Sequence, residues 1–123
     1  MTWKILGLAA ALMIGSAVPA LAESVCQEPI APAAVDGNTA TAVDLKAAVK
    51  DVKAFIKQSD DYQDCLWKEL ADANDKAKKD KKDPDPQLDA DVRAKVLSNQ
   101  KLKERVGAEY NAAAQAYNAK HPG

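Results

Sequence analysis

The chain has 123 residues, of which 28% are charged and 5% aromatic, and its formal net charge is −1. A near-neutral chain of this length has room for one small domain with a thin core, and no global charge would attract nucleic acid or a membrane surface. Its single histidine, His121, lies near the C-terminus and provides no buried base for Ser-His-acid or Cys-His catalysis, so we expect neither an enzyme nor a bound cofactor.

Residues 1–22 have the pattern of a cleaved export signal. Lys4 gives a basic start, Ile5 to Ile14 form an apolar run, and Ala20-Leu21-Ala22 offers the small residues that signal peptidase recognises. The apolar run is shorter than the about 20 residues that a membrane-spanning helix needs. We therefore expect a periplasmic or secreted protein that keeps no stable membrane anchor once residues 1–22 are removed.

Residues 23–40 show no helical periodicity and are predicted to form an extended arm. Pro29 and Pro32 disfavour a helix in this segment, and Asp36-Gly37-Asn38 is typical of a turn. The rest of the chain, residues 41–123, is predicted to be helical.

A long amphipathic helix is predicted over about residues 41–82. Thr41 is a suitable N-cap, Asp44 places an acid in the first turn, and no Gly or Pro follows before Pro84. Apolar residues recur at alternating steps of four and three, which is the spacing of a coiled-coil seam. These residues are Leu45, Val49, Val52, Ile56, Leu66, Leu70, Ala73 and Ala77.

A second helix is predicted over about residues 86–120. Pro84 ends the first helix, and Asp85-Pro86 is a favourable start for the next. Two long helices joined by a tight turn predict an all-α, coiled-coil-like antiparallel hairpin. Pairing outward from the turn places Ser59 and Asp60 opposite Gly107, and a close approach of the helices there would explain a glycine inside a helix.

The two cysteines, Cys26 and Cys65, are the only ones in the chain, and an even count in an exported protein favours one disulfide. Intermolecular pairing and free reactive thiols are the alternatives, and free thiols would permit a redox role. About 24 helical residues, or roughly 36 Å, separate Thr41 from Cys65, and an arm extended at about 3.3–3.6 Å per residue can run back that far. We expect the arm to lie over the helix pair as a third layer, held by a Cys26–Cys65 bond.

A weak candidate metal site is formed by Asp60, Asp61 and Asp64, which occupy neighbouring positions on the first helix. Clustered carboxylates attract hard cations. Lys57 and Lys68, however, each lie four residues from one of these aspartates, and ion pairs on the helix surface account for most of this charge. We expect no bound metal.

Three further features have two interpretations each. The polar residues Ser59, Gln63 and Asn99 interrupt the apolar seam, where they set the register of the helices or line a small site. The lysine-rich stretch 76–82 could touch an anionic surface, but its interleaved aspartates favour a solubilising helix end. Trp67 could anchor a partner, and packing under the arm near the disulfide is the preferred interpretation.

Segments 59–66 (Ser-Asp-Asp-Tyr-Gln-Asp-Cys-Leu), 106–113 (Val-Gly-Ala-Glu-Tyr-Asn-Ala-Ala) and 119–122 (Ala-Lys-His-Pro) resemble a group of small exported helical proteins of Gram-negative bacteria. The group is uncharacterised, and the resemblance extends over most of the chain after residue 22. It implies a periplasmic location and a disulfide between arm and helix, and it implies no activity.

These features predict a small helical binding or structural module. The alternative is a cation- or ligand-binding protein that uses Asp60, Asp61 and Asp64. A protein partner and a homodimer are both compatible with the alanine-rich outer faces of the helices, whereas nucleic acid is not expected as a partner.

Overall fold

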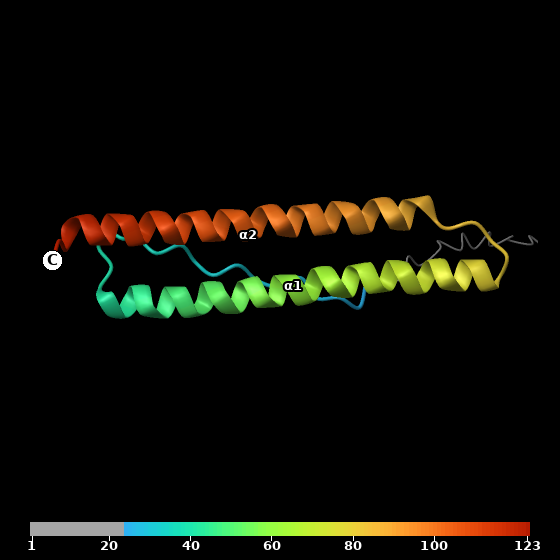
Figure 1. Ribbon diagram of the computed structural model, residues 1–123, viewed down its shortest axis with the longest axis horizontal. Helices are drawn as coiled ribbons and strands as arrows, with labels where there is room; N and C mark the ends of the chain where they lie inside the picture. The colour runs from blue at the N-terminus through green and yellow to red at the C-terminus, as the bar shows by residue number, and fades with distance from the viewer. Residues whose placement is uncertain (1–23) are drawn as a thin grey trace, which may run out of the picture.

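A computed structural model describes residues 24–123 and shows two long antiparallel helices with an extended arm lying along them (Figure 1). Helix α1 spans Ala42–Lys79 and helix α2 spans Pro86–Lys120. Residues 24–123 contain no strand, so the predicted all-α hairpin is confirmed. The predicted signal peptide, residues 1–22, lies outside the described residues.

The N-termini of both helices are capped as their sequences predict. Thr41 and Asp44 form a reciprocal capping box, in which Thr41 Oγ1 accepts from Asp44 N at 3.2 Å and Asp44 Oδ2 accepts from Thr41 N at 2.8 Å. Asp85 Oδ1 accepts from Gln87 N at 2.9 Å at the start of α2, with Pro86 in the first turn. These bonds satisfy amide groups that have no partner within the helix.

The C-terminal end of α1 differs from the prediction, because the helix stops at Lys79 rather than near residue 82. Lys82 N donates to Ala77 O at 2.8 Å, Lys81 N donates to Lys78 O at 3.1 Å, and Lys81 has a φ of 55°. This is a Schellman motif, in which the left-handed position is usually a glycine. A lysine at that position gives no sequence signal, so the early end of the helix was missed.

The early end of α1 shifts the pairing of the two helices by about one turn from the expected register. Asp60 pairs with Lys103 of α2 and does not lie opposite Gly107. A Cβ placed on Gly107 would meet no atom within 4 Å. The expected close approach of the helices at Gly107 is therefore wrong.

The core is a narrow seam with the seven-residue spacing of a coiled coil. On α2 the buried residues are Val92, Asn99, Val106 and Ala113. On α1 they are Ala48, Phe55, Ser59, Tyr62, Leu66 and Leu70. In the N-terminal half of α1, the predicted seam residues Leu45, Val49, Val52 and Ile56 are only half-buried. The buried apolar residues of this half are Ala48 and Phe55, one position before Val49 and Ile56, and the arm runs along the helix pair here (Figure 1).

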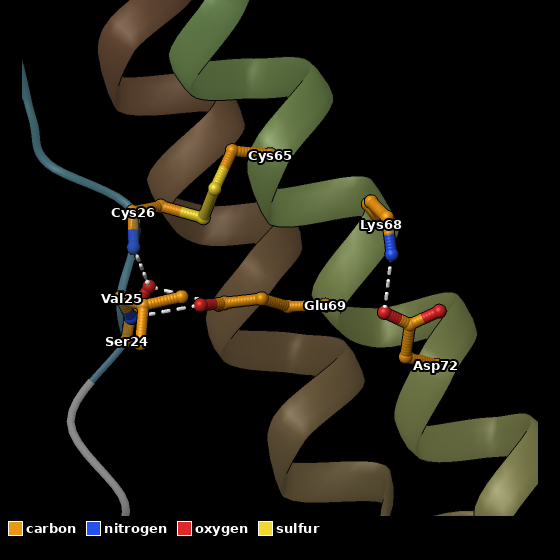
Figure 2. Close-up of a disulfide and its surroundings, with 7 residues drawn as sticks. All are labelled: Ser24, Val25, Cys26, Cys65, Lys68, Glu69 and Asp72. Carbon is orange, nitrogen blue, oxygen red and sulfur yellow. Dashed lines mark hydrogen bonds and ion pairs between the residues drawn. A yellow bond between two sulfur atoms is a disulfide. The ribbon is translucent and has the colours of Figure 1, made fainter.

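The N-terminal end of the arm is joined to the middle of α1 by the predicted disulfide. Cys26 and Cys65 are bonded, with their Cα atoms 5.8 Å apart. Glu69, one turn further along α1, accepts hydrogen bonds from Ser24 Oγ and from Val25 N, each at 2.8 Å (Figure 2). Covalent and charge-assisted contacts thus hold the same end of the arm.

The C-terminal end of the arm is packed against α2. A turn at Asp36 is closed by Ala40 N, which donates to Asp36 O at 2.9 Å. Gly37 lies so close to α2 that a Cβ on it would be 1.9 Å from Ala113 O. Lys120 Nζ donates to Asn38 O at 3.1 Å. Because both of its ends are held, the arm crosses the helix pair as a fixed third layer.

Candidate functional site

The three aspartates of the candidate metal site lie exposed on α1, and lysines bind two of them. Lys57 Nζ is 2.7 Å from Asp61 Oδ2, and this hydrogen bond raises the pKa of Lys57. Lys103 pairs with Asp60 across the helices. Asp60, Asp61 and Asp64 do not form a group with ligand atoms within 4.8 Å of one another. A cation bound here would have to displace both lysines.

Cys26, Cys65 and Glu69 do bring their ligand atoms within 4.8 Å of one another. Metals bind cysteine as the thiolate, and both sulfurs are consumed by the disulfide. The carboxylate of Glu69 is occupied by Ser24 and Val25 (Figure 2). A thiol redox role would need free thiols, and residues 24–123 contain none. The cluster therefore acts as a structural clamp on the arm.

The polar residues in the middle of the seam form a closed hydrogen-bond network. Ser59 and Asn99 are both 0% exposed. Asn99 Nδ2 donates to Ser59 Oγ at 3.3 Å, and Gln63 Nε2 donates to Asn99 Oδ1 at 2.8 Å. No buried side-chain nitrogen or oxygen in the described chain lacks a partner. Because a shifted register would break these bonds and leave buried polar groups unpaired, the network favours one pairing of the helices.

Trp67 and the lysine-rich tip both lie on the surface. Trp67 is 38% exposed, with the guanidinium of Arg93 from α2 5.5 Å from its ring centre. The preferred packing of Trp67 under the arm is wrong, because two residues after Cys65 a side chain points to nearly the opposite side of the helix. At the tip, Lys76 pairs with Asp80 at 2.7 Å, and Lys81 and Lys82 form the helix cap.

A groove of about 280 Å³ lies at the end of the hairpin remote from the turn, between the arm and both helices. Its walls are mostly apolar: residues 32–35 of the arm, Ala47, Ala48 and Val52 of α1, and Val106 and Tyr110 of α2. Phe55 and Ala113 are buried in the adjoining seam. The groove is therefore open space beside a packed core, in the class of sites where ligands bind between helices.

Three of the residues that line the groove are acidic, and none is basic. Asp44 comes from the first turn of α1, Asp51 from two turns further on, and Glu109 from α2. The hydrogen bonds from Thr41 lower the pKa of Asp44, so it is ionised at neutral pH. The groove therefore has apolar walls and a negatively charged edge.

The sequence predicts an arm over the helices, but the groove was not predicted. Four alanines line the space, Ala33 and Ala34 of the arm and Ala47 and Ala48 of α1, and their small side chains leave room there. Pairs of alanines in two segments that lie together are a usable signal. Their alignment depends on the path of the arm, however, and only the two held ends of the arm define that path.

A second hollow, of about 440 Å³, lies beside the disulfide. The arm contributes residues 25–29, and α1 contributes Gln58, Asp61, Tyr62 and Cys65. Burial raises the pKa of Tyr62. The walls of this second hollow are more polar than those of the groove. The disulfide that holds the arm against α1 already explains why these residues lie together.

Comparison of the chain with models of protein families, with curated proteins and with solved structures found no match. Within residues 24–123, neither helix has an apolar stretch long enough to cross a bilayer.

Proposed function

We propose that this protein is exported and acts as a small non-catalytic binding module, with the groove between the arm and the helices as its binding surface. The observation that carries the proposal is the arm itself, which is held at Cys26–Cys65 and at Gly37 and leaves an open, mostly apolar groove between itself and the two helices. A concave, mostly apolar surface with a few polar groups is the usual form of a small-molecule site.

Export is supported by the predicted signal in residues 1–22 and by the disulfide, because disulfides persist in oxidising compartments. The resemblance to small exported helical proteins of Gram-negative bacteria favours the periplasm. Expression in a Gram-negative host, cell fractionation and N-terminal sequencing test this part. We expect a periplasmic product that begins at Glu23, and a cytoplasmic product that retains Met1 would contradict it.

Binding is tested with a fragment library and methyl NMR spectra of the protein from Glu23 onward. Ligands in the groove are expected to shift the methyl signals of Val52 and Val106, and to leave those of Val92 near the turn unchanged. Ala47 is an exposed residue in the wall of the groove, so Ala47→Trp should fill the space without disturbing the core. Ala54 is also exposed on α1 but outside the groove, which makes Ala54→Trp the matched control.

The proposal requires that some fragments bind to the wild type and to Ala54→Trp but not to Ala47→Trp. If no fragment shifts Val52 and Val106, or if Ala47→Trp binds as well as the wild type, the groove is not a binding surface. Homodimerisation through the outer faces of the helices stays a prediction, and light scattering over a range of concentrations tests it.

A further inference from the structure

We propose that the ligand of the groove is a small amphiphilic cation, an apolar body that carries a primary ammonium group. This inference rests on the proposed function, because it assigns a chemical class to the ligand of that same groove. It follows from the walls, the charges and the size of the space.

The walls select an apolar body. Val52 and Val106 come from facing helices, and residues 32–35 of the arm close the third side. Tyr110 adds a half-buried aromatic ring. Burying an alkyl or aryl group against these surfaces removes apolar area from water, which is the main driving force for ligands in such sites.

The edge of the groove selects a positive charge. The carboxylate of Asp51 makes no hydrogen bond or ion pair with any residue in the described part of the chain, so it is available to a ligand. Both hydrogen bonds that Asp44 accepts from the backbone and hydroxyl of Thr41 end on Oδ2. Glu109 has a partner, Arg105, at 3.7 Å, but Arg105 does not line the groove.

The balance of charge argues against the other ligand classes. Three acidic residues from two helices line the space with no lining lysine or arginine, so an anion would be repelled by like charges. A neutral apolar molecule would fit the walls but gain nothing from the carboxylates. An ammonium group satisfies both requirements, with its alkyl part inside and its charge at the edge.

The size of the groove indicates one small molecule. At about 280 Å³, it lies near the lower limit of ligand pockets, which range over about 300–1,000 Å³. A protein partner would need a contact area of about 800 Å² on this chain, of which a groove of this size could supply only a small part.

The test compares three probes that share one six-carbon chain: hexylammonium, hexanol and hexanoate. Each is titrated into the protein from Glu23 onward, with the methyl signals of Val52 and Val106 as the readout. Hexylammonium is expected to bind about five- to tenfold more tightly than hexanol, and hexanoate is expected to cause no shift at millimolar concentration. Added salt should weaken hexylammonium binding and leave hexanol binding unchanged.

Charge variants identify the group that binds the ammonium. Asp51→Asn should weaken hexylammonium about three- to fivefold without changing hexanol. Asp61→Asn is the matched control, because Asp61 is on the same helix, outside the groove, and already paired with Lys57. It should change neither affinity.

The outcomes separate this inference from the proposed function. If hexanol or hexanoate binds as tightly as hexylammonium, or if Asp51→Asn has no effect, the cationic ligand class is overturned while the groove remains a binding surface. If none of the three probes shifts Val52 or Val106, the inference also fails. The fragment screen with Ala47→Trp then decides separately whether the groove binds anything.

Discussion

Loss of the disulfide should destabilise this protein more than any other single change to the arm. The bond joins Cys26 and Cys65, which are 39 positions apart. For a loop of about 40 residues, the chain-entropy model gives a stabilisation of about 4 kcal/mol. The free energy of unfolding of a small domain is about 5–15 kcal/mol in total, so this bond supplies a large share of it. The hydrogen bonds from Ser24 and Val25 to Glu69 depend on the same placement of the arm and should weaken with it.

The test is the Cys26→Ser/Cys65→Ser variant, measured by thermal melting and urea unfolding against the oxidised wild type. A loss of about 4 kcal/mol corresponds to a fall in melting temperature of about 15–30 °C for a domain of this size. The far-ultraviolet circular dichroism at low temperature should stay helical, because the buried cluster of Tyr62, Leu66, Leu70 and Val92 comes from the two helices, and Cys26 is the one arm residue packed against it.

Two controls make this result specific. Wild type reduced with dithiothreitol should melt at the same temperature as the double variant, because both lack only the bond. Glu69→Ala in the oxidised protein should cost a smaller amount, about 1–2 kcal/mol. Equal melting temperatures for the oxidised protein and the double variant would refute the claim that the bond holds the arm in place.

Three further predictions follow from individual contacts. Gly37→Ala should lower the free energy of unfolding by about 1–3 kcal/mol, because its Cβ would be 1.9 Å from a backbone oxygen of Ala113. Gly107 lies in open space inside α2, so Gly107→Ala should instead raise the free energy of unfolding, by at most about 1 kcal/mol. Equal effects of the two substitutions in urea unfolding would show that Gly37 does not touch α2. Lys81→Gly should raise the free energy of unfolding by about 0.5–1 kcal/mol, because Lys81 has a φ of 55°, and a loss of stability would contradict the left-handed cap. Hydrogen bonds from Thr41 lower the pKa of Asp44 below its ordinary value of 3.8. The stability that this carboxylate adds is therefore present above pH 3.8 and is lost as the pH falls through the lowered pKa. The melting temperatures of wild type and Asp44→Ala should converge as the pH falls, and a constant difference would argue against the capping box.

Local signals in the sequence were sufficient to predict the two helices and the disulfide. Thr41 with Asp44, and Asp85 with Pro86, are capping pairs that act within a few residues. The even cysteine count favoured the disulfide, and backbone dimensions showed that an extended arm can bring Cys26 back to a residue far along α1.

The features that were missed depend on contacts between distant segments. The register shifted because Lys81 takes a conformation usually left to glycine, and no local pattern shows this. Gly37 reads as an ordinary turn residue, and its contact with Ala113 exists only once the arm lies on α2. The groove depends on the register of the helices and on the contact of Gly37 with α2, since its walls come from three segments of the chain.

The clamped arm forms one wall of the proposed binding groove, and binding of hexylammonium to the oxidised protein and to the Cys26→Ser/Cys65→Ser variant tests this most directly. The titrations are made at a temperature where both proteins are folded. Without the bond only the Gly37 end of the arm is held, so the wall formed by residues 32–35 should loosen and binding should weaken about threefold or more, because one side of the apolar site is no longer fixed. Equal affinity in the two proteins, with the same shifts of Val52 and Val106, would contradict the account.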